Sequence, residues 1–163
     1  MKTVGIVAFA FGTPESIMSN RCIAQIVSQK VHDLEAPVYT QLDIHVEPGI
    51  EVEYTEEKLG NPPPTLRIAR GAIQWAKRQG FTELLVIAAK PHLCRCFRDL
   101  THAVREAGAQ IVIHVCSGTS YHPQNGWYCL DSTQVRVQSP WKWWKRELIL
   151  RLMPFFIYKR MAS

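Results

Sequence analysis

The sequence lacks an uninterrupted apolar run of the roughly 18 residues that a membrane-spanning helix needs. It also lacks internal repeats and low-complexity segments. The start of the chain, Met1 to Gly5, is basic and then apolar for only a few residues, so we expect no signal peptide. With 47% hydrophobic and 20% charged residues, the 163-residue chain has globular proportions and a length that suits one hydrophobic core. We therefore predict a single α/β domain over residues 1–163, with a basic aromatic C-terminal helix and tail from about residue 140.

The spacing of the cysteines does not suit a metal site. The five cysteines are Cys22, Cys94, Cys96, Cys116 and Cys129. An odd number without a secretory signal predicts reduced thiols and a cytoplasmic location, with membrane association as an alternative. Structural zinc sites usually combine two ligand pairs with two to four residues between their members. Here one close pair has a single residue between its members, so we predict no metal ligands among the cysteines and expect them to pack in the interior.

The net charge of +5 is confined to one end of the chain. Residues 140–163 contain six basic residues and one acidic residue, whereas residues 1–139 contain thirteen of each sign. A nucleic-acid-binding domain usually spreads its basic residues over a docking face. We therefore do not expect nucleic acid as a partner, and interpret the basic segment as an interaction tail or a solvated helix face.

Continuous apolar runs predict strands that are buried on both faces, over residues 4–10, 84–89 and 111–115. Helical spacing of apolar residues predicts helices over 65–80 and 92–108. Strands that alternate with helices indicate βαβ units with right-handed crossovers. The predicted fold is therefore a three-layer Rossmann-like α/β domain, with a mostly parallel sheet and helices on both faces.

Weaker signals add further elements to this fold. Thr13 is a candidate cap for a helix that begins at Pro14 and ends before Pro37. Strand-forming residues at 38–44 and 51–54 predict two short strands, and residues 133–137 predict a last strand. A final helix is expected over 141–152.

Ligands in open α/β sheets bind beyond the carboxyl ends of the strands. Three predicted loops leave such ends, over residues 11–16, 90–95 and 117–127. We therefore expect Gly12 and His92 to emerge side by side from neighbouring parallel strands and to face a common crevice.

The first loop contains Gly12, Thr13 and Ser16, next to a predicted helix N-terminus that attracts anions. It has neither the three-glycine dinucleotide fingerprint nor the lysine of a P-loop, which disfavours nucleotide binding in those two modes. In the alternative interpretation, Thr13 and Ser16 only cap the helix.

The second loop brings Lys90, His92 and Arg95 to the start of a helix. Two fixed positive charges and a titratable ring can hold a phosphate or carboxylate, with His92 as a catalytic general acid or base. The alternative is a solvated first helical turn. The third loop is long, polar and aromatic, and adds Tyr121 and His122 as candidate ligand-binding residues.

The last predicted helix places Trp141, Trp144, Leu148 and Leu152 on one face. We expect this face to dock on the sheet and leave a basic face in solvent. The alternative is peripheral contact with a membrane through Trp141, Trp144, Lys145 and Arg146, because aromatic and basic residues together suit a membrane interface.

Three segments carry a family resemblance: PTLRIAR at 64–70, LVIAAKPHLCR at 85–95 and KREL at 145–148. They resemble the threonine-led helix start, the strand with a histidine-arginine turn and the closing helix of the YdcF-like domain family, the bacterial SanA, ElyC and YdcF-type proteins. The resemblance implies a Rossmann-like sheet with Thr65, His92 and Arg95 in a polar crevice. It also implies S-adenosylmethionine or a similar nucleotide-bearing molecule as ligand.

Three functional hypotheses follow from the sequence. The first is an α/β domain that binds an anionic, nucleotide-like small molecule at the strand ends, in a reaction that the sequence does not specify. The second is a non-enzymatic interaction protein or membrane-surface protein that acts through its basic aromatic tail. The third is a chelatase-like metal site that uses His92, His122 and nearby acidic residues. No serine or cysteine nucleophile has an identifiable base, so covalent catalysis is not predicted.

Overall fold

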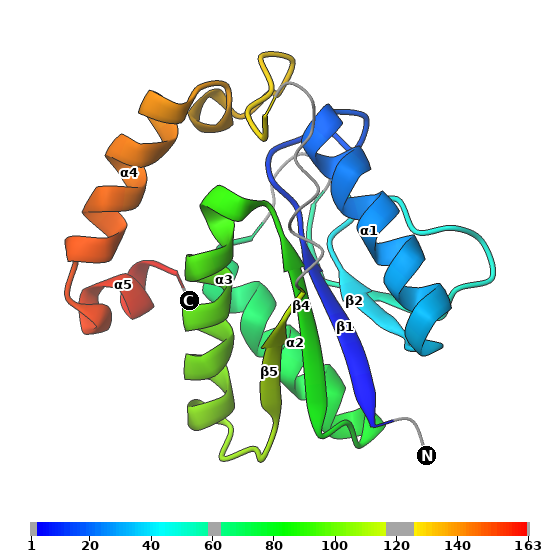
Figure 1. The fold of residues 1–163 in the computed structure, drawn as a ribbon. Coiled ribbons are helices and arrows are strands. Elements are labelled where there is room, and N and C mark those ends of the chain that lie inside the picture. The colour runs from blue at the N-terminus through cyan, green and yellow to red at the C-terminus, as the bar shows by residue number, and fades with distance from the viewer. Residues whose placement is uncertain (1–2, 59–62, 117–125, 163) are drawn as a thin grey trace.

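The computed structural model describes residues 3–58, 63–116 and 126–162, and its centre is a five-stranded, all-parallel sheet (Figure 1). The strand order is β3-β2-β1-β4-β5. The strands are β1 (Val4–Phe9), β2 (Val38–Thr40), β3 (Val52–Tyr54), β4 (Glu83–Ala88) and β5 (Val112–Val115). The chain moves outward from β1 in one direction through β2 and β3, and in the other through β4 and β5. The order therefore reverses between β1 and β4, which is where such sheets bind ligands.

Helices cover both faces of the sheet, as the sequence predicted. They are α1 (Met18–Leu34), α2 (Thr65–Gln79), α3 (Lys90–Glu106), α4 (Pro140–Leu152) and α5 (Phe155–Met161). Alternate side chains of β1 point to opposite faces of the sheet. Ile6 and Ala8 pack in the core under α1, while Val7 and Phe9 pack in the core under α2 and α3. The strands β1, β2 and β4 are largely buried, which explains their apolar sequence. The predicted burial of the strand at 111–115 on both faces is wrong, because β5 lies at the edge of the sheet and Val112 and Val115 are exposed.

The first helix begins four residues later than predicted, at Met18, and Thr13 does not cap it. The Asn20 side chain holds the preceding turn instead. Its Oδ1 accepts a hydrogen bond from the Phe11 N–H at 2.9 Å, and its Nδ2 donates to the carbonyls of Gly12 and Pro14, each at 3.0 Å. This side chain satisfies the backbone of the turn, so the turn needs no helical hydrogen bonds of its own.

The predicted strand at 133–137 is wrong, because this segment forms the short 3₁₀ helix η2 (Val135–Val137). Ser132 and Thr133 bind the loop after β1 rather than a sheet edge. The Thr133 N–H donates to the Thr13 carbonyl at 2.9 Å, and the Ser132 hydroxyl donates to the same carbonyl at 3.0 Å. The segment therefore closes over the carboxyl end of β1.

The C-terminal helices α4 and α5 lie beside α3 (Figure 1). The predicted docking face of α4 is wrong: Trp141 and Leu152 are 78% and 75% exposed, and Trp144 and Leu148 are also exposed. The buried face carries Trp143, Glu147 and Leu150 instead. The helix packs on η2, on Phe11 after β1 and on the start of α3, so its buried face does not follow the apolar stripe. No helix in the described residues is long and apolar enough to cross a bilayer.

Candidate anion-binding cleft

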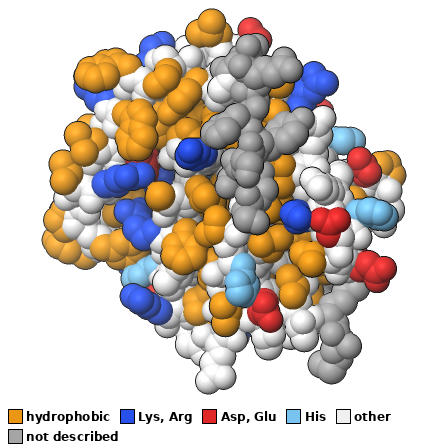
Figure 2. Space-filling model, in the orientation of Figure 1, with side chains coloured by type: hydrophobic (Ala, Val, Ile, Leu, Met, Phe, Trp, Pro, Cys, Tyr) orange, Lys and Arg blue, Asp and Glu red, His pale blue; other side chains and the backbone are white. Residues whose placement is uncertain are grey.

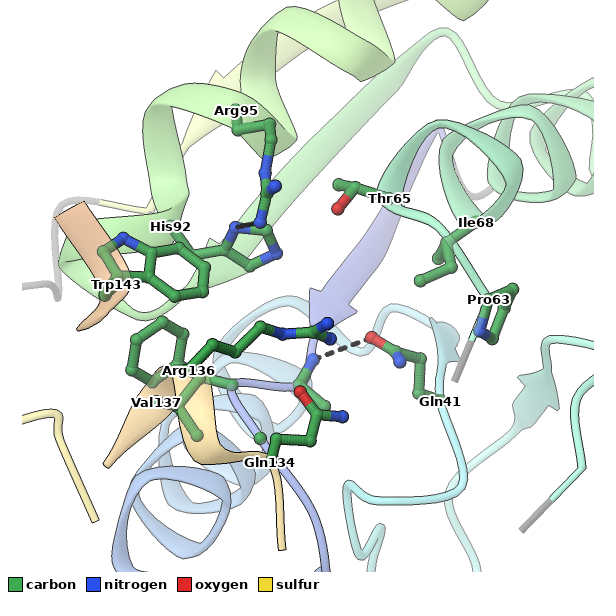
Figure 3. A pocket seen from close by; sticks show the side chains of 13 residues that line it. Gln41, Pro63, Thr65, Ile68, His92, Arg95, Gln134, Arg136, Val137 and Trp143 are labelled. Atoms are coloured by element: carbon green, nitrogen blue, oxygen red, sulfur yellow. Dashed lines mark hydrogen bonds between the residues drawn. The ribbon is translucent and has the colours of Figure 1, made fainter. Parts of the chain in front are cut away.

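The site lies at the carboxyl ends of β1 and β4, where Gly12 and His92 line one cavity. Figure 3 shows His92 in this cavity, beside Arg95. The two strands pair in parallel along their whole length, from Val4 opposite Glu83 to Phe9 opposite Ala88. The loop after β1 and the first turn of α3 therefore leave the sheet side by side. A Cβ atom at Gly12 would lie 2.7 Å from Val137 Cγ2, so this position needs glycine for the close approach of η2.

Two adjoining cavities make up the cleft. The inner cavity has a volume of about 40 Å³, and the outer one has a volume of about 310 Å³. The volume of the outer cavity lies at the lower end of the range for small-molecule sites. Pro63, Thr65, Arg95 and Arg136 line both cavities and so join them. The inner wall is formed by the N-termini of α2 and α3. The outer wall is formed by α4 and α5, which places the C-terminal tail in the site.

Arg95 lies in the second turn of α3 and is only 8% exposed. Its Nη2 is 3.1 Å from His92 Nδ1, its Nη1 is 3.5 Å from Glu147 Oε2, and its guanidinium lies 5.2 Å from the centre of the Trp143 ring. Its Nε is buried without a hydrogen-bond partner among the described residues. A buried guanidinium with a donor left over can bind a further acceptor in the cleft.

His92 is held as a neutral hydrogen-bond donor. A guanidinium can only donate, so Nδ1 of His92 accepts from Arg95 and the ring proton lies on Nε2. The ring points into the space between Thr65 and Arg136 (Figure 3). Burial, and then the charge of Arg95, lower the pKa of His92 well below its ordinary value. The ring therefore offers an N–H to the cleft and no lone pair for taking up a proton.

Two more arginines reach the cleft from the C-terminal part of the chain. Arg136 comes from η2 and lines both cavities, and Arg146 comes from α4 and lines the outer one. Within the described residues neither makes an ion pair. Burial, followed by the charges of Arg146 and Arg95, lowers the pKa of Arg136 to about 10. The three guanidinium groups thus repel one another in a partly desolvated space.

Among the described residues, Glu147 is the carboxylate that pairs with this cluster, and the buried Asp99 lies near enough for its charge to interact with that of Arg95. Glu147 is 1% exposed and contacts Arg95, and its Oε1 is also 3.3 Å from Arg151 Nε. No aspartate or glutamate belongs to the lining of either cavity, as far as the described residues go. The starts of α2 and α3 add the positive ends of two long helices. The cleft is therefore electropositive and lined by hydrogen-bond donors.

The structure brings together four of the residues that the sequence singled out: Gly12, Thr65, His92 and Arg95. Lys90 and Ser16 are exposed and lie outside the lining. Thr13 is buried, and its hydroxyl bonds to that of Thr133 instead of facing the cleft. Tyr121 and His122 lie outside the described residues.

Sequence reasoning missed Arg136, Gln134, Gln41 and Trp143 as lining residues. Arg136 lies in a segment that was predicted as a strand, and nothing in its local pattern indicates a site. The sequence analysis places Arg146 in the basic tail and in the KREL segment at 145–148, but not in the crevice. Two signals point to this helix: the KREL segment at 145–148 and the single acid, Glu147, among six basic residues over 140–163.

Metal-binding geometry does not appear in the described residues, where no three histidine, cysteine, aspartate or glutamate side chains lie together. His122, part of the chelatase-like alternative, lies outside them.

The chain matches no family model and no curated protein. Among solved structures it is similar to the universal stress protein from Archaeoglobus fulgidus in complex with dAMP, with a TM-score of 0.38 and 12% sequence identity. The match covers 71% of this chain and 98% of that chain. The fold class of this protein rests on its own parallel sheet and the helices on both faces.

Proposed function

We propose that this protein binds a phosphate-bearing small molecule of the nucleotide type in the cleft between α2, α3 and α4. The observation that carries the proposal is the convergence of Arg95, Arg136 and Arg146 on a cavity whose described lining contains no carboxylate. A phosphate dianion removes the repulsion between the guanidinium groups and accepts paired hydrogen bonds from them.

The charge of the cleft favours a phosphate ester over S-adenosylmethionine. The sulfonium of S-adenosylmethionine is itself a cation, and a cluster of arginines repels it. The outer cavity of about 310 Å³ suits a ligand of nucleotide size, with its phosphate among the arginines. Membership of the YdcF-like family stays a proposal, supported by the placement of Thr65, His92 and Arg95 in one crevice.

We infer that His92 positions the ligand rather than moving a proton. Its Nδ1 is occupied by Arg95, and its Nε2–H faces the cleft. A general base would need a lone pair there, and no carboxylate of the described residues lines the cleft to replace it. Binding without turnover is therefore the activity that this donor set supports best.

Calorimetry of the full chain with adenosine, AMP, ATP and S-adenosylmethionine tests the proposal. We expect heat from AMP and stronger binding of ATP, because added phosphates gain contacts with the arginines, and little or no heat from adenosine or S-adenosylmethionine. Affinity should fall as salt rises, since the attraction is electrostatic. Equal binding of adenosine and AMP, or no binding of any phosphate ester, would contradict the proposal.

The substitution Arg136→Gln separates binding from folding. We expect a loss of about 10- to 100-fold in nucleotide affinity, as for other charge-assisted hydrogen bonds. The melting temperature of the unliganded protein should stay the same or rise, because glutamine removes a cation that burial and its neighbours disfavour. Arg105→Gln is the matched control, since Arg105 lies at the exposed end of α3, outside the cleft, and should leave both values unchanged.

A further inference from the structure

Exposed apolar side chains are concentrated at the C-terminal end of the protein. Of the seventeen large hydrophobic residues that are exposed in the described part of the chain, eight lie between residues 141 and 161. They are Trp141, Trp144, Leu148, Ile149, Leu152, Phe156, Ile157 and Met161. Single exposed hydrophobic residues are ordinary, but so dense a group marks an interaction surface.

Four of these residues form a stripe along the outer side of α4. Trp141, Trp144, Leu148 and Leu152 are spaced by three, four and four residues, which places them on one face of a helix. The opposite face carries Trp143, Glu147 and Leu150 and is buried in the protein. The helix therefore has two apolar faces, of which the fold uses only one.

Cations surround this outer face. Lys142, Lys145 and Arg151 flank the stripe on α4, and Lys159 and Arg160 follow on α5. Figure 2 shows blue side chains among the orange ones on the side of the molecule that α4 and α5 form. The one acid of this segment, Glu147, is buried on the inner face. The segment that carries the net charge of +5 therefore also carries these eight exposed apolar side chains, although its Arg146 lines the cleft and its Lys159 pairs with Glu106.

We propose that the outer face of α4 and α5 docks on an anionic membrane surface, with the helices in the plane of the interface. Tryptophan favours the headgroup region, and leucine and phenylalanine favour the start of the acyl region. Lysine and arginine can keep their stems in the apolar layer while their charged ends meet lipid phosphates. The face thus supplies both parts of interfacial binding, apolar burial and attraction to negative charge.

Charge and composition favour a membrane over other occupants. A second copy of the chain would place the same cations opposite one another, and their repulsion opposes a dimer through this face. Single-stranded nucleic acid binds through stacking on aromatic rings. Here Leu148, Ile149 and Leu152 make up much of the surface, and aliphatic side chains offer no ring for stacking.

Flotation of the full chain with lipid vesicles tests the inference. Vesicles of phosphatidylcholine are compared with vesicles that contain about 30% phosphatidylglycerol, which supplies the negative surface potential. We expect at least about tenfold stronger binding to the anionic vesicles, and its loss in high salt. The fluorescence of the tryptophans should shift to shorter wavelength on binding, because Trp141 and Trp144 leave water.

Two variants separate the apolar and the electrostatic contributions. The triple substitution Trp141→Ser, Leu148→Ser and Leu152→Ser should weaken binding by about 100-fold or more, because three side chains no longer enter the bilayer. The double substitution Lys142→Gln and Lys145→Gln should weaken it by about 30-fold, at roughly fivefold for each charge. All five side chains are exposed, so both variants should fold with unchanged melting temperatures.

Matched controls use exposed residues elsewhere on the protein. Met18→Ser, Leu34→Ser and Val112→Ser remove as many exposed apolar side chains from α1 and β5 and should leave vesicle binding intact. Lys58→Gln with Lys90→Gln is the charge control. No binding to anionic vesicles, equal binding to both lipid compositions, or an equal loss in the controls would overturn the inference.

This inference is independent of the ligand in the cleft. Both tail variants retain Arg95, Arg136 and Arg146, so their nucleotide affinity should match that of the unmodified chain. The tail variants should lose vesicle binding and keep nucleotide binding, whereas Arg136→Gln should lose nucleotide binding and keep vesicle binding. The two proposals can therefore be tested separately. Binding of the outer face to an oligonucleotide instead of vesicles would also reject the membrane proposal.

Discussion

Arg95 donates a hydrogen bond from Nη2 to Nδ1 of His92 across 3.1 Å, and this contact decides what the histidine can do. The two residues are three positions apart at the start of α3, where the sequence suggested acid-base chemistry. Instead, the arginine fixes the proton on Nε2 and keeps the ring neutral. The cleft therefore presents donors to its ligand, and the histidine is one of them.

The first prediction concerns the pH dependence of stability through His92. Its pKa in the folded protein lies well below the ordinary 6.5, mainly because of burial and Arg95. Below pH 6.5 the unfolded chain takes up a proton on this ring that the folded protein does not, so stability falls as the pH drops. Below pH 6.5, the unfolding free energy of the unmodified protein should therefore fall with decreasing pH more steeply than that of His92→Gln. We expect the difference to reach up to about 1.4 kcal/mol per pH unit.

Urea unfolding at a series of pH values measures this difference. The glutamine side chain in His92→Gln keeps an acceptor for Arg95 but cannot titrate. We therefore expect a change in the slope of unfolding free energy against pH. His45→Gln serves as control because His45 is exposed, and its slope should match that of the unmodified protein. Identical slopes for the unmodified protein and His92→Gln would show that the ring is not held neutral.

The second prediction concerns Asp43, a buried carboxyl group that is 5% exposed. Burial, and then the charges of Glu57 and Glu15, raise its pKa from 3.8 to about 6. The effect of pH on stability is opposite to that of His92. As the pH rises from 3.8 through 6, the unfolding free energy falls, because burial disfavours the charged carboxylate in the folded state. Asp43→Asn should therefore stabilise the protein at neutral pH, by on the order of 2 kcal/mol.

Thermal or urea unfolding at neutral and acidic pH checks this prediction. The gain in unfolding free energy should disappear at a pH below the ordinary pKa of aspartate, because the carboxyl group is then neutral in the folded and the unfolded protein. Asp131→Asn, at an exposed position, should have little effect at either pH. A destabilised Asp43→Asn variant at neutral pH would mean that the charged carboxylate makes a favourable contact.

The third prediction compares two glycines of similar backbone conformation. Gly12 has φ +100° and Gly49 has φ +92°, so alanine meets similar backbone strain at both positions. At Gly12 the added Cβ would also lie 2.7 Å from Val137 Cγ2 and 2.8 Å from Ser132 Oγ, whereas at Gly49 nothing lies within 4 Å. Gly12→Ala should therefore cost about 1–3 kcal/mol more than Gly49→Ala in unfolding free energy. An equal loss of unfolding free energy in the two variants would show that η2 does not pack closely against the turn after β1.

The fourth prediction concerns the contact that holds α5 against α3. The Tyr158 hydroxyl donates to Oδ2 of Asp99, which is fully buried and also pairs with Arg98 at 3.0 Å. Tyr158→Phe removes a hydrogen bond to a buried carboxylate, so we expect a loss of about 1.5–3 kcal/mol in unfolding free energy. Because Tyr158 also lines the outer cavity, nucleotide affinity should fall as α5 loosens.

Limited proteolysis complements the unfolding measurement, since a loosened α5 should be cleaved faster at Lys159 and Arg160. Tyr54→Phe is the control, because the Tyr54 side chain is exposed on β3. Stability and cleavage rate should be unchanged in that variant. Unchanged cleavage in Tyr158→Phe would place the anchor of α5 elsewhere, in the apolar contacts of Leu66 and Leu150.

The sequence by itself determined the sheet, its parallel sense and the strands between which the cleft opens. Runs such as 4–10 and 84–89 are apolar throughout because both of their faces are covered, and this pattern has few other interpretations. The helices over 65–80 and 92–108 were equally clear, because each packs an apolar stripe on the sheet. Local patterns suffice where an element meets an apolar surface.

Only the tertiary structure decided which charges meet in the cleft and which face of α4 is buried. Arg136 and Arg146 reach Arg95 from segments about 40 and 50 residues further along the chain, and no local pattern encodes such a meeting. The α4 helix turns Glu147 inward because a buried arginine attracts it, although Trp141 and Leu152 form the more apolar stripe. The buried face of α4 is set by contacts with residues far away in the sequence, Phe11 for Trp143 and Arg95 for Glu147, and those contacts exist only once the chain has folded.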